Sequence, residues 1–403
     1  MKKNVLIAVI SVIVVIFVFS TGLWIGINFD SLKRYLSNTE QSDISAADDK
    51  FNLDAFEEVW KLISGNSLIE KSNEAITEAG LEGMLSVLDD RYAEYFTAKE
   101  YSKIMEAYSG TTSGIGVVVT LNEEEQVLVI RILEDAPASG AGIMEGDIIV
   151  KVDDIEIKDM DLESVVAMIK GKEGTGVSLK IFRPSEDKIL EIDVTRAKFY
   201  IPNLISDIFE ENIGYIWYYD FQVNGATQLD KEIQKLIDNG ASGLILDLRN
   251  NPGGTWDDAI EVCDLFINEG IISTIKGRND NKVRTDEFAA RKGKYTEIPL
   301  VVLINGFSAS ASELVAGALK DSGRATLVGE ISYGKGVIQG LYELSDGSGI
   351  KFTTAKYFLP SGTSVEGVGV KPDIMIELKE DDTEDVQLDR AIEEINILIS
   401  EIE

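Results

Sequence analysis

The spacing of the apolar residues changes twice along this chain, and these changes constrain its fold more than any other feature of the sequence. Residues 51–109 carry apolar side chains at helical spacing. Residues 110–197 instead carry short apolar runs typical of strands, with one predicted helix among them. In residues 198–403, runs of the strand and helix types alternate. The pattern predicts a multidomain α/β protein in which a β-rich domain lies between a helical region and a larger α/β domain.

The alternation in the third region is regular enough to place its elements. We expect strands at residues 213–218, 243–248 and 300–304 and helices at residues 227–239, 255–268 and 311–319. The chain then ends with an apolar helical stripe formed by Leu388, Ala391, Ile392, Ile395, Leu398 and Ile399. Such a stripe has to be buried, and either the core of this domain or the interface of a homodimer would bury it.

The N-terminus carries the longest apolar run of the chain. The residues from Val5 to Ile27 are almost all apolar, and a helix of this length crosses a hydrocarbon core of about 30 Å. We therefore expect a transmembrane signal-anchor over residues 1–28, followed by a polar linker over residues 29–50. The alternative is a cleaved signal peptide, whose apolar region is normally only about 7–15 residues long. Basic residues flank the run on both sides, so they give only a weak bias toward an N-terminus inside the cell.

Composition excludes several classes of function. The formal net charge of −32 at pH 7 repels the phosphate backbone of nucleic acids, so we expect no nucleic-acid partner. The chain contains no histidine, which excludes catalysis by Ser-His-Asp or Cys-His arrangements. Cys263 is the only cysteine, so neither an intrachain disulfide nor a cysteine-rich zinc site can form. Any catalytic base must therefore be a residue other than histidine.

Ser310 is the first candidate for catalysis. The predicted strand at residues 300–304 breaks at Gly306 and leads through Ser310 into a predicted helix. The N-terminus of a helix favours an anion, including the oxyanion of a tetrahedral intermediate, so a serine placed there could be acylated. A purely structural interpretation also stands, because Ser310 and Glu313 have the spacing of a capping box.

Lys335 is the candidate base. It lies between Gly334 and Gly336, which let the backbone approach a site closely. A lysine acts as a base only when it is neutral, so burial has to lower its pKa from about 10.4 by several units. Pairs of serine and lysine are an established substitute for serine and histidine.

A glycine turn completes the constellation. The predicted strand at residues 243–248 ends in the sequence Asn251-Pro252-Gly253-Gly254, whose exposed N–H groups could help to bind an oxyanion. By itself such a sequence is simply a good turn. These segments together resemble the C-terminal processing peptidases, or tail-specific proteases. The resemblance rests on residues 247–254, 308–313, 333–339, 353–357, 360–362 and 367–373.

Membership of this family would imply a crotonase/ClpP-like α/β peptidase core in a bacterial protein whose catalytic part lies outside the cytoplasm. The resemblance makes Ser310 the nucleophile, Lys335 the general base and Gln339 the residue that orients the lysine. It also implies oxyanion donors at Ala311, Gly253 and Gly254, and neither a metal nor an organic cofactor. Asp321 matches an acidic position of uncertain role.

The β-rich domain resembles a PDZ domain. Residues 113–117 are similar to a carboxylate-binding loop, which gives Gly114, Ile115, Gly116 and Val117 as candidate peptide ligands, and residues 136–154 match the centre of that domain. Leu162, Val166 and Ile169 would line the groove and favour an apolar C-terminal side chain, although any amphipathic helix buries such a stripe. Many relatives have arginine where this chain has Lys170, which puts gating of activity by the bound ligand in doubt.

Three classes of function are compatible with these features. A membrane-anchored serine endopeptidase would capture protein or peptide substrates with apolar C-termini through the PDZ domain and form an acyl-enzyme on Ser310. A non-catalytic PDZ scaffold at the membrane would give Ser310, Lys335 and Gln339 no purpose. An acyl-CoA enzyme of the crotonase type would share only the fold.

Overall fold

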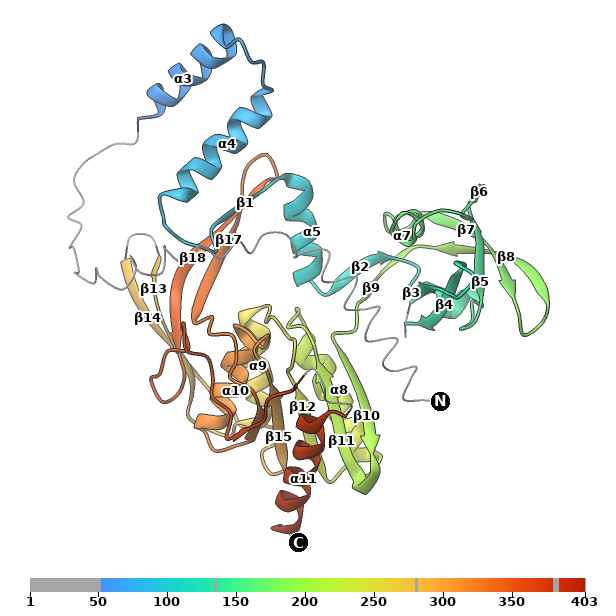
Figure 1. The fold of residues 1–403 in the computed structure, drawn as a ribbon, viewed down its shortest axis with the longest axis vertical. Coiled ribbons are helices and arrows are strands. Elements are labelled where there is room, and N and C mark those ends of the chain that lie inside the picture. The colour runs from blue at the N-terminus through green and yellow to red at the C-terminus, as the bar shows by residue number, and fades with distance from the viewer. Residues whose placement is uncertain (1–51, 134–135, 280–281, 380–383, 403) are drawn as a thin grey trace. The chain divides into compact units, whose positions relative to one another are not determined.

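The computed structural model describes residues 52–133, 136–279, 282–379 and 384–402 (Figure 1). Within these ranges no helix has both the length and the apolar character that a membrane span needs. The predicted signal-anchor over residues 1–28 and the predicted linker over residues 29–50 lie outside the described residues. The described chain forms two compact units, a small one with residues 52–77 and 120–126 and a large one with the remainder.

The small unit contains helix α3 (Leu53–Asn66) and the first turn of helix α4 (Asn73–Ser86). The side chain of Asn52 caps α3, and the Trp60 indole N–H donates a hydrogen bond to Asn73 Oδ1 over 3.0 Å. The apolar side chains that predict these helices remain exposed, among them Phe56, Val59, Trp60 and Ile63.

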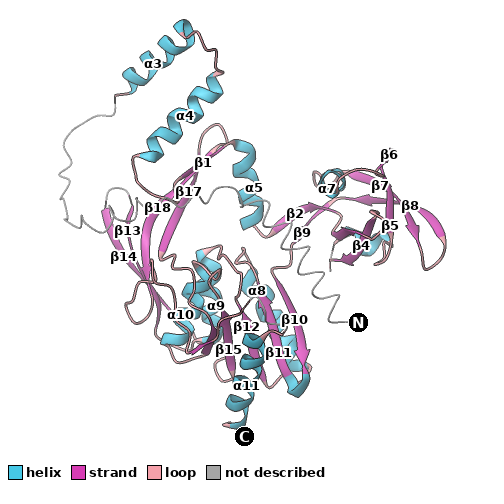
Figure 2. Cartoon of the chain, viewed as in Figure 1, coloured by secondary structure: helices cyan, strands magenta, loops and turns pink. Residues whose placement is uncertain are grey.

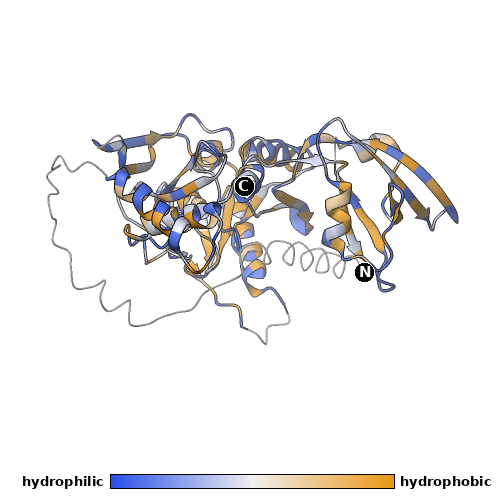
Figure 3. Cartoon of the chain, turned by 90° about the horizontal axis from the view of Figure 1, so that it is seen from above, coloured by the Kyte–Doolittle hydropathy of each residue, from blue (hydrophilic) through white to orange (hydrophobic). Residues whose placement is uncertain are grey.

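The β-rich domain is a sheet of five strands in the order β3-β4-β5-β7-β8, to which a short β6 pairs. The strands are β3 (Val117–Leu121), β4 (Val127–Ile132), β5 (Ile148–Val152), β6 (Ile155–Glu156), β7 (Gly176–Arg183) and β8 (Lys188–Thr195). Two helices accompany the sheet, α6 (Pro137–Ala141) and α7 (Leu162–Ile169). Apolar and polar residues alternate along its longest strands, as a sheet with one buried face requires (Figure 3).

The two ends of this domain pair with each other. Strand β2 (Thr111–Gly114) enters the domain and strand β9 (Ala197–Tyr200) leaves it, and the two run antiparallel in a two-stranded sheet. The β-rich domain is therefore an insertion that interrupts the larger domain without separating its parts.

The larger domain is built on a six-stranded sheet in the order β10-β11-β12-β15-β16-β19, parallel except for its first pair (Figure 2). Its strands are β10 (Leu204–Phe209), β11 (Ile213–Tyr218), β12 (Gly243–Asp247), β15 (Leu300–Ile304), β16 (Thr326–Gly329) and β19 (Ile374–Met375). Helices α8 (Gly225–Asp238), α9 (Trp256–Phe266) and α10 (Ala311–Asp321) share one core cluster with the sheet. Alternate residues of the strands bury the other face under α11 (Val386–Ser400).

Helix α11 carries the C-terminal apolar stripe, and the structure shows what buries it. Ala391 and Ile395 are fully buried against β12 and β15, and Leu388, Ile392, Leu398 and Ile399 pack around them. The stripe is buried in the core of the chain itself, so it gives no support to a dimer interface.

A second sheet, whose pairings the periodicity does not reveal, lies beside the serine turn. It has the order β1-β18-β13-β14, with β17 also paired to β18. Its strands are β1 (Glu94–Phe96), β13 (Ile271–Asn279), β14 (Lys282–Ala289), β17 (Val337–Glu343) and β18 (Gly349–Phe358). Helix α5 (Ala98–Tyr108) follows β1, and its last residue reaches the pocket described below. The predicted α/β multidomain architecture is confirmed.

Candidate active site

Ser310 occupies a strained turn between β15 and α10. Its backbone has φ 56° and ψ −111°, which a residue with a side chain rarely adopts. The buried side chain of Ser308 fixes this turn. Its hydroxyl accepts a hydrogen bond from Asn305 N over 2.9 Å and donates one to Leu248 O over 2.8 Å. Ser310 is thus held at the N-terminus of α10 by contacts with the end of the neighbouring strand β12.

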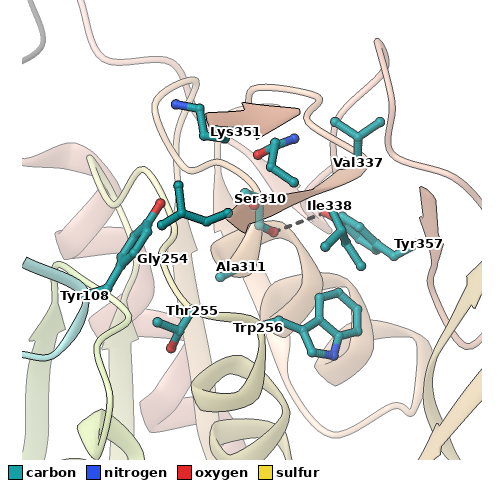
Figure 4. A pocket seen from close by; sticks show the side chains of 12 residues that line it. Tyr108, Gly254, Thr255, Trp256, Ser310, Ala311, Val337, Ile338, Lys351 and Tyr357 are labelled. Atoms are coloured by element: carbon teal, nitrogen blue, oxygen red, sulfur yellow. Dashed lines mark hydrogen bonds between the residues drawn. The ribbon is translucent and has the colours of Figure 1, made fainter. Parts of the chain in front are cut away.

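Ser310 lines a cavity of about 160 Å³ (Figure 4). Most of the wall is apolar or aromatic, and five chain segments contribute to it. They supply Tyr108, Gly254, Thr255, Trp256, Ala311, Val337, Ile338, Gln339, Leu341, Lys351 and Tyr357. A pocket of this kind next to a serine can hold one side chain of a bound polypeptide.

A buried carboxylate joins the serine turn to the lysine loop. Glu313, in the first turn of α10, has no exposed surface. Its Oε2 accepts hydrogen bonds from the backbone N–H groups of Ser310 and Lys335, both over 2.8 Å. Its Oε1 accepts from the Ser332 hydroxyl over 2.6 Å and from Gly334 N over 2.7 Å. The capping box is therefore present. Its Glu313 side chain also fixes the backbone of Lys335 beside that of Ser310.

Tyr357 of β18 makes a second link between the same two residues. Its side chain is buried, and its hydroxyl lies 3.1 Å from Ser310 O and 3.2 Å from Lys335 O (Figure 4). Burial raises the pKa of this phenol well above 10, so it stays protonated as a donor.

The amine of Lys335 lies against an aromatic ring. Its Nζ is 4.8 Å from the centroid of the Tyr92 ring, in the segment that precedes β1. Burial lowers the pKa of Lys335 below its ordinary 10.5, and the positive charges of Lys351 and Arg91 lower the pKa further. The carboxylates of Glu313 and Glu366 oppose this shift. The environment thus favours the neutral amine that general-base catalysis requires.

The glycine turn lies against the serine. Gly253 and Gly254 have φ 103° and 147°, and a Cβ on Gly253 would come within 3.0 Å of Ser310 Cβ. The N–H of Gly253 donates to Asn251 Oδ1 over 2.8 Å. Among the described residues, no hydrogen bond engages the N–H groups of Gly254 and Ala311. These two residues line the cavity together with Ser310, and their amides are free to donate to a ligand there.

Gln339 also lines the cavity, at a point where β17 is irregular. The pairing of β17 with β18 shifts register between Ile338 and Gln339. The Nε2 of Gln339 is buried and has no hydrogen-bond partner in the described part of the chain. A buried donor without a partner costs free energy unless a ligand or a moving side chain satisfies it.

The residues expected to bind a peptide lie together in the β-rich domain. Ile115 is buried, and Gly116 has φ 78° with so little space that an added Cβ would overlap Ala136. Val117 begins β3, the edge strand of its sheet. In α7, Ile169 is only 5% exposed and belongs to the domain core, whereas Leu162 and Val166 are partly exposed. Gly114 is buried in β2 beside Lys170.

Asp321 and Arg249 each make contacts that hold the fold together and lie away from the Ser310 cavity lining. Asp321 lies at the far end of α10 from Ser310 and accepts a hydrogen bond from Ser361 N over 3.0 Å. The sequence reasoning passed over Arg249, which pairs with Asp247 at 2.6 Å and with Asp385 at 2.8 Å and so ties the glycine turn to α11. Arg249 follows directly after the buried strand β12, and this position is the sequence signal for a buried ion pair at the end of the sheet.

The same elements carry the similarity to known proteins. Residues 212–376 match peptidase family S41, and residues 113–194 match the PDZ domain. A carboxy-terminal-processing protease of Bartonella bacilliformis is 37% identical over 327 residues, which cover 80% of this chain and 74% of that protein. A carboxyl-terminal-processing protease of Picosynechococcus is 35% identical over 366 residues, 86% of each chain. Among solved structures, a photosystem II D1 C-terminal processing protease is 28% identical with a TM-score of 0.46 and covers 82% of this chain and 94% of that one.

The fold and these matches define a serine peptidase with an inserted PDZ domain, a combination suited to protein or peptide substrates. The chain belongs to the carboxy-terminal-processing proteases of peptidase family S41. The resemblance stated from the sequence motifs is confirmed.

Proposed function

We propose that this protein is a membrane-anchored endopeptidase that captures the C-terminal tails of proteins in its PDZ domain and cleaves nearby peptide bonds with Ser310. One observation carries the proposal. The buried Glu313 carboxylate accepts hydrogen bonds from the backbone N–H groups of both Ser310 and Lys335. A contact of this kind holds two loops in one geometry, which a serine–lysine pair needs and a scaffold does not.

The proposed acylation step uses Ser310, Lys335 and Gln339 together with two backbone amides. The neutral amine of Lys335 removes the proton of Ser310 Oγ as Oγ attacks the carbonyl carbon, and Gln339 orients the amine. The N–H groups of Ala311 and Gly254 donate to the oxyanion. The Lys335 ammonium then protonates the departing amine nitrogen while the C–N bond breaks. Lys335, neutral again, then takes a proton from a water molecule as the water oxygen attacks the ester carbon, and it returns that proton to Ser310 Oγ as the C–Oγ bond breaks.

The remaining assignments extend this proposal to the whole chain. An apolar C-terminal tail would add as a strand beside β3, with its carboxylate near residues 114–117 and its last side chain against Leu162 and Val166. The apolar run of residues 5–27 would anchor the protein as a single pass in a bacterial cell membrane, with the peptidase outside the cytoplasm. The exposed apolar face of α3 is suited to a homodimer.

The test is digestion of casein and of peptides with apolar tails. Ser310→Ala and Lys335→Ala should each lose at least about 10²-fold in rate. Ser345→Ala, in the turn between β17 and β18, and Lys356→Ala, in β18, remove the same groups at exposed positions and should retain full activity. Full activity in Ser310→Ala would overturn the assignment. A wild-type protein that binds tails and cleaves none of several tailed substrates would instead support a scaffold.

A further inference from the structure

The side chain of Lys335 is held by packing against a ring and not by a hydrogen bond. Among the described residues its amine has no hydrogen-bond partner, although the backbone N–H and C=O of the same residue are both engaged. The amine instead lies over the face of Tyr92, 4.8 Å from the ring centroid. Neither the sequence motifs nor the acylation step above gives Tyr92 a role.

Contacts on both sides of Tyr92 fasten its segment to β18. Asp90 Oδ1 accepts a hydrogen bond from Tyr92 N over 3.0 Å, and Asp90 Oδ2 accepts one from Thr353 N of β18 over 2.6 Å. Two residues after Tyr92 the chain enters β1, which pairs with β18. Tyr92 therefore lies between two attachments to the same strand, and these fix its backbone.

A second carboxylate ties this segment to the lysine loop. Glu366 Oε2 accepts a hydrogen bond from Gly336 N over 2.7 Å, and Glu366 Oε1 is 3.3 Å from Arg91 Nη2. Arg91 Nη2 in turn donates to the Tyr92 hydroxyl over 2.5 Å. The contacts thus run from Gly336 through Glu366 and Arg91 to Tyr92, whose ring meets Lys335, the residue before Gly336. A closed set of contacts of this kind fixes the ring relative to the amine.

The ring contacts the amine and does not border the substrate pocket. Tyr92 is not among the residues that line the cavity next to Ser310. A lysine side chain is long and flexible, whereas a general base must stay within hydrogen-bond reach of the proton that it removes. Water that reaches the amine also forms hydrogen bonds that compete with the one to the serine hydroxyl. A ring held against the amine restricts both its movement and the access of water.

We propose that Tyr92 is a positioning residue for the general base: its ring covers the amine of Lys335, keeps water from that side and limits the directions in which the amine can point. The inference rests on the proposed role of Lys335 as base. It makes the segment between α4 and β1 part of the active site, although this segment lies outside residues 212–376, which match the peptidase family. Because the ring and not the hydroxyl meets the amine, phenylalanine should fill the same role.

The first measurement compares kcat and KM of the full chain and its variants on a short peptide. Tyr92→Ala should lower kcat about tenfold and leave KM unchanged, because the ring positions the base and does not line the cavity. Tyr92→Phe keeps the ring and should restore most of the wild-type kcat. Tyr95→Ala is the control, since it removes another partly buried tyrosine three residues away in β1, and it should change neither constant.

The second measurement follows the cover over the amine without using the peptidase reaction. Cyanate carbamylates neutral amines, and at about pH 10.5 a lysine amine is at least half neutral. The rate of Lys335 carbamylation at that pH, followed by mass spectrometry in a Ser310→Ala background, therefore reports how freely a small molecule reaches the amine. Tyr92→Ala should raise this rate at least about fivefold, because the ring no longer blocks one side. Tyr92→Phe and Tyr95→Ala should leave it unchanged.

Urea unfolding identifies any variant that is not folded under the assay conditions. Tyr92→Leu fills part of the space without a ring, and it should change kcat and carbamylation in the same directions as Tyr92→Ala. It replaces Tyr92→Ala in both measurements if the alanine variant does not fold.

The variants separate failure of this inference from failure of the base assignment. Full activity in Lys335→Ala would remove the base assignment, whatever the Tyr92 variants do. If Lys335→Ala is inactive, a wild-type kcat in Tyr92→Ala would overturn the positioning role, and so would an unchanged rate of Lys335 carbamylation. A higher KM with an unchanged kcat would also overturn it, because that result would mean that Tyr92 binds the substrate.

Discussion

At the scale of single residues, the site depends on groups whose partners are far away in the sequence. Glu313 lies three residues after Ser310, and its position indicates only a helix cap. In the structure it also binds Ser332, Gly334 and Lys335, and its cap accounts for a minority of its hydrogen bonds. A local motif could not reveal these contacts, because the loop that supplies them is placed by the fold.

Glu313→Gln tests whether the carboxylate is needed or only its shape. In the glutamine variant an NH₂ group, which cannot accept, replaces one of the two carboxylate oxygens. If it replaces Oε2, the buried N–H groups of Ser310 and Lys335 lose their acceptor, at roughly 1–3 kcal/mol each. We expect about 2–4 kcal/mol less stability and a rate at least tenfold lower. Urea unfolding and peptide hydrolysis measure both. Asp321→Asn, on the same helix with one hydrogen bond, should change stability by under about 1 kcal/mol and leave the rate unchanged.

The lowered pKa of Lys335 also predicts how the free energy of unfolding depends on pH. Its folded pKa lies below its unfolded value, so between these two values the unfolded chain binds more protons and stability rises with pH. At pH 7 the folded state therefore carries a cost that Lys335→Met removes. We expect this variant to be more stable than the wild type at pH 7, and to lack the wild-type gain between pH 7 and pH 10, while its peptidase rate falls at least about 10²-fold.

Denaturant unfolding at several pH values measures the effect, with Lys356→Met as the control for loss of a lysine. Equal stability of the wild type and Lys335→Met across this range would show that burial imposes no cost on the amine.

At the scale of elements, predictability follows burial. Strands β12 and β15 are buried on both faces and read as continuous apolar runs, so they and helix α10 could be placed from the sequence. Strands β14 and β17 are largely exposed or only partly buried. Their sequences therefore lack the regular apolar pattern that predicts a strand. The pairing of β1 with β18 joins residues more than 250 positions apart, as Glu94 with Lys351 shows. Single-sequence periodicity carries no information about such pairs.

The glycine turn offers a matched test at this scale. Gly253 and Gly270 have almost the same φ, 103° and 102°, but only the first has neighbours within reach of a Cβ. An alanine at 253 would place Cβ 2.7 Å from Ala309 O and push the turn away from Ser310. Both variants should lose about 1 kcal/mol or more to backbone strain. Only Gly253→Ala should also lose at least tenfold in kcat, as measured on a short peptide, and an equal loss in Gly270→Ala would remove the steric explanation.

At the scale of the whole molecule, the paired strands β2 and β9 insert the PDZ domain between α5 and β10 of the peptidase. This arrangement separates capture of a tail from cleavage, so each should respond to its own variants. Val166→Lys places a charge on the partly exposed wall of α7, where an apolar terminal side chain would dock. We expect KM for a peptide with an apolar tail to rise about tenfold, equivalent to about 1.4 kcal/mol. Turnover of a short peptide without a tail should not change, because it does not need the groove.

Ala167→Lys introduces the same charge at the next, exposed position of the helix and is the control, with a KM close to that of the wild type. A fluorescent peptide with the apolar tail gives direct affinities for both variants in the Ser310→Ala background. If Val166→Lys binds and processes tailed peptides as Ala167→Lys does, the tail is not held by this face of α7. Since Ile169 is already part of the domain core, Leu162 and Val166 are the residues of that face on which the contact depends.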